Sequence, residues 1–126
     1  GVYIKDDGIL MSLQGFEGGA ITSTAAIYAA NGFFDTSAAR VKTNVVEIDA
    51  SKADAVRLVE FDRTDKKHHG YGVIAQELEK VYPEMVNTDS EGFKSVNYNE
   101  LAMVKIKYLE DKVARLEALV GRLLAE

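Results

Sequence analysis

The chain has 126 residues and a mass of 13.8 kDa, which is the size of one domain or of one domain with a fragment of its neighbour. Its hydrophobic fraction of 47% and charged fraction of 28% are typical of a globular protein and argue against wholesale disorder. The absence of cysteine excludes a disulfide framework, a thiolate zinc site and a cysteine nucleophile. A net charge of −5 argues against a nucleic-acid partner, and no stretch approaches the ~20 apolar residues of a membrane span.

The first 36 residues predict two β-hairpins, each made of two short apolar runs about a turn signal. Asn-Gly is the strongest of these signals, because a type I′ turn needs two residues that tolerate positive φ. Strands this short could not bury much core alone, so we expect residues 1–37 to be the C-terminal end of an upstream β-structured protein. The runs and turns are residues 2–4 and 9–11 about Asp6-Asp7-Gly8, and residues 27–30 and 33–36 about Asn31-Gly32.

The middle of the chain predicts mixed short elements. Apolar residues at helical spacing indicate a small helix, which Pro83 should end because proline lacks the N–H and clashes with the preceding turn. Asn97 with Glu100 three residues later is typical of a helix start. The expected elements are a strand at 45–48, an ambiguous segment at 53–61, a charged loop at 63–70, a strand at 71–74, a helix at 75–82 and a hairpin with strands at 85–88 and 93–98.

The last segment, residues 97–126, carries the clearest periodicity in the chain. Six apolar residues are spaced 3-4-3-4-3, which is a heptad seam with β-branched residues at a and leucine at d. Lysines at g face glutamates at the following e of a parallel neighbour, in the pairs Lys105–Glu110 and Lys112–Glu117. An amphipathic helix packed on its own domain is the alternative. The seam residues are Ile106, Leu109, Val113, Leu116, Val120 and Leu123.

The number of strands in the coiled coil follows less directly from the pattern. Ile or Val at a with Leu at d favours two strands in isolated coiled coils. Leu119 and Leu124, at g and e, widen the apolar face as a third helix requires. We therefore predict an α+β fold of short strands, hairpins and a small helix, ending in a long C-terminal helix that forms a parallel trimeric coiled coil.

Three blocks of the sequence resemble a known family. The blocks are Gly72-Val73-Ile74-Ala75-Gln76-Glu77-Leu78, Tyr82-Pro83-Glu84-Met85-Val86 and Gly92-Phe93-Lys94-Ser95-Val96-Asn97-Tyr98-Asn99-Glu100-Leu101. They are similar to the C-terminal intramolecular chaperone domain of bacteriophage tailspikes, tail fibres and neck appendages. This endosialidase-type self-cleaving domain is also found in the myelin regulatory factor of animals. The resemblance covers about residues 31–126, and the blocks occur in the family's order.

The resemblance implies a function in virion assembly. Domains of this family form homotrimers, promote folding of the β-rich trimer that precedes them in the same polypeptide, and are then cut off. On this interpretation residues 1–37 belong to the upstream cargo and residues 38–126 form the chaperone, with its trimerisation helix at 97–126. The resemblance places the reaction in the host cytoplasm during assembly, after which the upstream part stays in the virion tail or appendage.

The segment Ser37-Ala38-Ala39-Arg40-Val41-Lys42-Thr43-Asn44-Val45 is similar to the family's cleavage box. That box reads Ser-Asp, a variable residue, Arg, an aliphatic residue, Lys, a variable residue, Asn and an aliphatic residue. The resemblance implies that Ser37 is the nucleophile of a serine peptidase and Lys42 its general base, with the cut between Ser37 and Ala38, to within one residue. A serine hydroxyl needs a base to take its proton, and a lysine can do so once burial favours its neutral form.

Ala38 departs from the family pattern, which has aspartate at this position. The replacement leaves two functions open, whether it arose by divergence or was made to block processing. The first is an assembly chaperone that cleaves itself, and the second is a permanent trimerisation domain. No motif for a cofactor is present. His68-His69 near Asp62 and Asp65 lacks a third ligand at metal-site spacing, so we predict no metal site.

Overall fold

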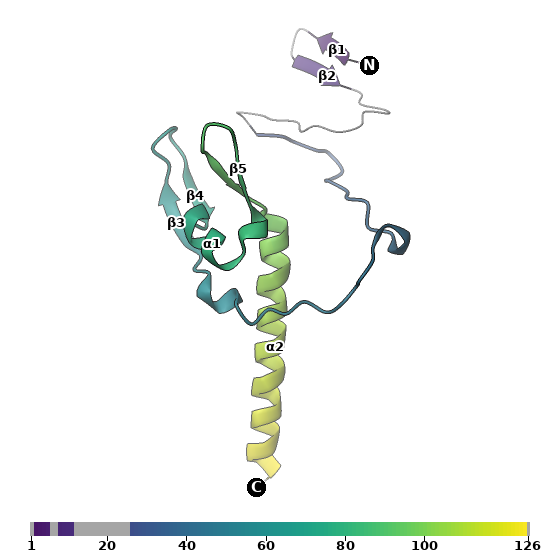
Figure 1. Cartoon of the computed structure of the whole chain (residues 1–126), viewed down its shortest axis with the longest axis vertical. Coiled ribbons are helices and arrows are strands. Elements are labelled where there is room, and N and C mark those ends of the chain that lie inside the picture. The colour runs from purple at the N-terminus through teal and green to yellow at the C-terminus, as the bar shows by residue number, and fades with distance from the viewer. Residues whose placement is uncertain (1, 6–7, 12–25, 126) are drawn as a thin grey trace. The chain divides into compact units, whose positions relative to one another are not determined.

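The computed structural model describes the backbone of residues 2–5, 8–11 and 26–125, and the side chains of residues 26–125. The chain divides into two compact units, Gly1–Thr43 and Asn44–Glu126. The N-terminal unit holds β1 (Val2–Lys5), β2 (Gly8–Met11) and the 3₁₀ turn η1 (Ala39–Val41). The C-terminal unit holds η2 (Ala53–Ala55), β3 (Val59–Asp62), β4 (His69–Gly72), α1 (Ala75–Val81), η3 (Pro83–Met85), β5 (Val86–Thr88), β6 (Lys94–Val96) and α2 (Tyr98–Ala125) (Figure 1).

The first predicted hairpin is confirmed and the second is wrong. β1 and β2 pair antiparallel from Val2↔Met11 to Lys5↔Gly8, and the turn residues 6–7 lie outside the described residues. At the Asn-Gly signal, the amide of Gly32 donates to the carbonyl of Ala29 over 3.3 Å, with no strand on either side. Only Gly32 has positive φ in this turn, at 87°, whereas a type I′ turn needs two such residues.

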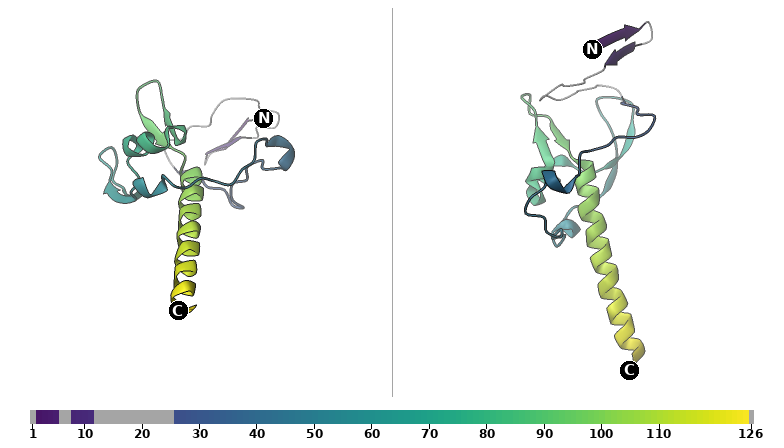
Figure 2. Two further views of the ribbon diagram at one scale, coloured as in Figure 1. Left: turned by 60° about the horizontal axis from the view of Figure 1, so that its bottom comes forward. Right: turned by 90° about the vertical axis from the view of Figure 1, so that its right-hand side faces the viewer.

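The C-terminal unit consists of short antiparallel pairs gathered about the start of one long helix. β3 pairs with β4, and β5 pairs with β6, each in a two-stranded sheet. Figures 1 and 2 show that α2 runs on well beyond the other elements of this unit. The predicted α+β class is confirmed, as are the small helix, the β5–β6 hairpin and the long terminal helix.

The segment before η2 differs from its prediction. Residues 45–48 form no strand, and Val45 and Val46 are 77% and 84% exposed. A strand needs a neighbour for its backbone groups, and this segment pairs with none of the described strands. The ambiguous segment 53–61 resolves into η2 and the start of β3, and the strand predicted at 71–74 is instead β4, which begins at His69 and ends at Gly72.

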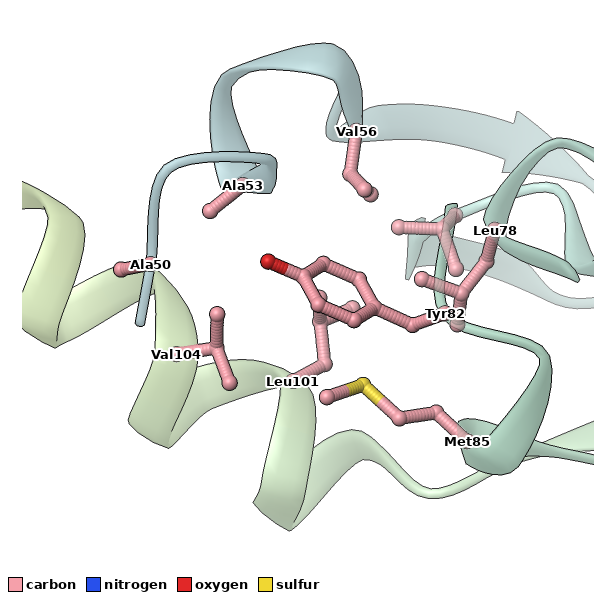
Figure 3. Close-up of a cluster of buried hydrophobic side chains, with 9 residues drawn as sticks. Ala50, Ala53, Val56, Leu78, Tyr82, Met85, Leu101 and Val104 are labelled. Carbon is pink, nitrogen blue, oxygen red and sulfur yellow. The ribbon is translucent and has the colours of Figure 1, made fainter. Parts of the chain in front are cut away.

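One small apolar core holds the C-terminal unit together. Its largest fully buried side chain is Leu78 of α1, and Tyr82 lies at the centre of the cluster in Figure 3. From α2 only Leu101 and Val104 are buried, so the core covers the first two turns of that helix. The nine core residues are Ala50, Ala53, Val56, Val73, Leu78, Tyr82, Met85, Leu101 and Val104.

Local signals set the bounds of α2 and α1 as predicted. The Asn97 side-chain oxygen accepts from the amide of Glu100 over 3.1 Å, which is an N-cap bond. Pro83 follows the end of α1 and opens η3, where its missing N–H is not needed. Among the described residues, no helix is long and apolar enough to cross a membrane.

The β4 end is fixed to the start of α2 by Tyr98. Its hydroxyl accepts a hydrogen bond from the amide of Val73 over 3.2 Å. A Cβ placed on the adjacent Gly72 would stand 2.2 Å from that hydroxyl oxygen and 2.9 Å from the ring carbon that bears it. A side chain at residue 72 would have to displace the end of the Tyr98 ring, whereas glycine permits this close approach.

We predict that Gly72→Ala lowers the free energy of unfolding by about 1–3 kcal/mol, because the methyl group displaces Tyr98 and leaves the amide of Val73 without its acceptor. Chemical denaturation measures the change. Gly121→Ala is the matched control: it lies on α2 with nothing within 4 Å of the added Cβ, and should gain up to about 1 kcal/mol from helix propensity. Equal effects of the two substitutions would contradict this account of Gly72.

Tyr82 gives the core a pH dependence. Burial raises the pKa of Tyr82, with smaller contributions from Asp49 and Glu84, and its hydroxyl has no hydrogen-bond partner among the described groups. Because the folded state disfavours the ionised phenol, stability is complete below the unfolded pKa of about 10 and falls as the pH rises above it. We predict that Tyr82→Phe loses part of this alkaline destabilisation at little cost near pH 7. Tyr71→Phe, at a ring 76% exposed, should retain it.

Candidate cleavage site and oligomerisation surface

The N-terminal unit brings Ser37 and Lys42 into contact. Nζ of Lys42 lies 2.5 Å from Oγ of Ser37, a short hydrogen bond across five residues of sequence. The intervening η1 turn accounts for this proximity: Val41 donates to the carbonyl of Ala38, and Lys42 to that of Ala39, each over 3.1 Å. The turn folds the five intervening peptide units back on themselves, and this brings the serine and lysine side chains within contact distance.

Both side chains of the pair are exposed, as is every residue from 26 to 49. In a single chain the Lys42 side chain is therefore open to water. A general base of this kind needs a neutral amine, which burial favours. The contact supplies the geometry for proton transfer from Ser37. The burial that would activate Lys42 is not provided by the described residues of a single chain.

Ala38 occupies the N-cap position of η1. Its φ of −66° and ψ of 146° are those of an N-cap, yet alanine provides no side-chain acceptor for the turn. Aspartate is among the best N-cap residues, so the residue that the family box carries here would hold the turn that joins Ser37 to Lys42. Further along the box, Asn44 has φ of 53°, a left-handed conformation that asparagine tolerates better than most residues.

The predicted seam lies in a row along α2, and every member is about half exposed or more. The exposed fractions run from 50% at Ile106 to 61% at Leu123, while Leu119 and Leu124 are 43% and 82% exposed. Exposed apolar area this extensive on one helix is a mark of an interaction surface. The assignment of this surface to a trimer remains a prediction.

Lys105 differs from its expected role. Its ammonium donates to the carbonyl of Ala53 over 2.7 Å and also to that of Val56, and so ties η2 to α2. A lysine held by two carbonyls of its own chain is poorly placed to pair with Glu110 of a neighbour. The pairing of Lys112 with Glu117 of a neighbouring copy stays a prediction. In the single chain, the Lys112 ammonium lies 5.7 Å from the centre of the Tyr108 ring.

An apolar groove of about 710 Å³ lies beside the upper part of the seam. The β3–β4 side contributes Leu58 and Tyr71, and α2 contributes Tyr98, Ala102, Ile106 and Leu109. These six residues are hereafter called the groove; Glu60 of β3 and Lys105 of α2 also border it. Leu58 and Tyr71 are 67% and 76% exposed, so nothing in the described chain covers them. Sequence periodicity along the helix could not reveal the groove, because its other wall comes from a hairpin about 30 residues earlier.

One ionic contact joins the segment after the cleavage box to α2. Lys107 lies 3.2 Å from Asp111, one helical turn on, and 3.6 Å from Glu47. The hydrogen bond to Asp111, with help from Glu47, raises the pKa of Lys107, so this ammonium stays charged throughout the neutral range. Both carboxylates are exposed, so the two contacts contribute little to stability.

The two adjacent histidines lie outside any metal cluster among the described residues. Nδ1 of His69 lies 2.7 Å from the carboxylate of Asp62 on the paired strand, and its Nε2 lies 3.8 Å from Glu60. Asp65 is held by Arg63 instead, whose guanidinium lowers the pKa of that carboxyl to about 2. His69, Asp62 and Asp65 are thus engaged in cross-strand and loop contacts.

The comparison with known families supports the resemblance. Residues 37–87 match the family of peptidases described as the chaperone of endosialidase. No curated protein matches the chain. The matched segment contains Ser37 and Lys42 and the first two of the three blocks that carry the resemblance. The endosialidase-type intramolecular chaperone domain is therefore confirmed as the family of this segment, and it supports an intramolecular chaperone role for a domain of a larger phage protein.

Proposed function

We propose that this chain forms a homotrimer through α2, assists the folding of the β-rich trimer that precedes it, and is released by autoproteolysis at Ser37. The contact between Ser37 and Lys42 carries the proposal, because a serine hydroxyl and an amine at hydrogen-bond distance are the minimum apparatus for acyl transfer. The family match at residues 37–87 supports the chaperone role. The setting we propose is the host cytoplasm during virion assembly.

The physical basis of a trimerising chaperone is the topology of its cargo. β-rich trimers have high contact order and expose strand edges while they fold, so early alignment of three chains limits misassembly. Once the aligning helix is removed, an unfolded product can no longer reassemble. Its lifetime is then set by the barrier to unfolding. A permanent trimerisation domain, the second candidate, shares the first step and lacks the second.

The position of the cut decides how Ser37 can react. In a cut between Thr36 and Ser37, Oγ attacks the Thr36 carbonyl carbon through a five-membered ring while Lys42 takes the hydroxyl proton. The C–N bond then breaks, the proton passes to the new amine of Ser37, and water hydrolyses the resulting ester. In the predicted cut between Ser37 and Ala38, attack on its own carbonyl would close a four-membered ring, so the attacking hydroxyl has to come from another copy.

We predict that Ala38→Asp produces self-cleavage, because aspartate caps η1 and restores the family's residue. A denaturing gel should show fragments of about 37 and 89 residues, and the intact mass of the larger fragment identifies the bond that was cut. Adding Ser37→Ala or Lys42→Ala should leave the chain whole. Cleavage that persists with Ser37→Ala would remove serine as the nucleophile, whereas an intact, trimeric Ala38→Asp protein would favour the permanent trimerisation domain.

We predict that Val113→Asp with Leu116→Asp abolishes the trimer, because six carboxylates would enter a shared apolar core and unpaired buried charge is prohibitive. Sedimentation equilibrium should give three times 13.8 kDa for the unchanged chain and 13.8 kDa for the double variant. Ala114→Asp with Ala118→Asp adds the same charge away from the seam and should stay trimeric. A monomeric unchanged chain, or a double variant that remains trimeric, would contradict the assembly.

A further inference from the structure

The groove lies on one flank of the seam. The seam begins at Ile106, and in the same heptad register of α2 Ala102 occupies the d position about one turn earlier and Tyr98 the g position about two turns earlier. The groove is therefore continuous with the predicted helix interface and extends it sideways to the β3–β4 hairpin. A partner helix that packs on the seam therefore brings the side chains on its adjacent face up to the groove.

The apolar character of this flank depends on Lys105. This g-position residue also borders the groove, but its ammonium bonds to the carbonyls of Ala53 and Val56. Only the hydrocarbon part of Lys105 is left to line the cavity. In most coiled coils the g positions carry charged residues. Here the g side of α2 presents an apolar surface on which an apolar side chain can pack.

The opposite flank of the same helix supplies such a group. Met103 occupies an e position, is 58% exposed, and lies on the far side of the seam from Tyr98. In a parallel coiled coil a g residue of one helix meets the e residue five positions later on its neighbour, as in the predicted pair Lys112–Glu117. One heptad before Lys105, the same rule pairs Tyr98 with Met103 of the next copy.

We infer that the groove of one copy receives the Met103 side chain from α2 of the next copy. The two surfaces differ, so the contact is heterologous, and three such contacts close a ring with cyclic symmetry. Methionine suits the site because its unbranched thioether fills irregular cavities and packs well against aromatic rings such as Tyr71 and Tyr98. The inference rests on the proposed trimer and adds the hairpin of each copy to the interface.

Cross-linking tests this contact, because the chain has no cysteine and Met103→Cys creates a unique thiol. The thiol is labelled with benzophenone maleimide, the oligomer is verified by sedimentation, and the sample is irradiated. We expect cross-linked bands at the mass of two or three chains, with peptides joined to Leu58, Tyr71 or Tyr98. The same label on Ala118→Cys, at an f position away from the seam, should give no adduct with these three residues.

The outcomes separate this contact from the trimer itself. A labelled trimer whose cross-links remain within one chain, or join other residues, overturns the Met103 contact and leaves the trimer standing. A monomeric unlabelled protein overturns both.

Substitutions without the label provide a second measurement. Met103→Asp should raise the concentration at which the trimer dissociates by about tenfold or more, because it places a carboxylate in an apolar groove. Met103→Leu should change that concentration by less than about threefold, since it conserves volume and polarity. Equal dissociation of the two variants would overturn the contact, because a solvent-exposed side chain tolerates either residue.

Discussion

The constraint on which this structure depends is the mismatch between the length of α2 and the size of the core beside it. The helix has 28 residues, and only Leu101 and Val104 among them are buried. The remaining turns carry an apolar row that a single chain leaves in water, at a cost that grows with the area exposed. In the proposed trimer this row is covered by the helices of the other copies. The small body at the start of α2 is stabilised chiefly by its own nine-residue core.

The body and the helix are joined by contacts that cross long stretches of sequence. Lys105 holds the carbonyls of η2, and the Tyr98 hydroxyl holds the amide that follows β4. These contacts orient the β3–β4 hairpin against the first turns of α2 and so form one wall of the groove. In the proposed trimer, assembly of the helices and placement of the hairpins would be coupled for this reason, since the same residues serve both.

The proposed cleavage chemistry depends on local structure and on burial. Ser37 and Lys42 meet through a local turn, so their contact needs no long-range packing. What a single chain lacks is the exclusion of water from the lysine. Under the proposed function, a dyad that forms locally and is activated only by burial would tie the cut to the completion of folding, as a chaperone that stays attached until its cargo is folded requires.

Local patterns in the sequence predicted α1, the β5–β6 hairpin, the Asn97 cap and the seam, because periodicity and capping act within a few residues. Residues 45–48 carried an equally local signal and formed no strand, because a strand depends on a partner elsewhere. The Asn31-Gly32 turn has positive φ only at Gly32 and so lacks the type I′ geometry of a hairpin. Spacing and resemblance brought Ser37 and Lys42 together as candidates, while their distance came from the structure. The groove and the partners of Lys105 were decided by tertiary structure alone, since they join segments about 30 to 50 residues apart whose pairing no local pattern encodes.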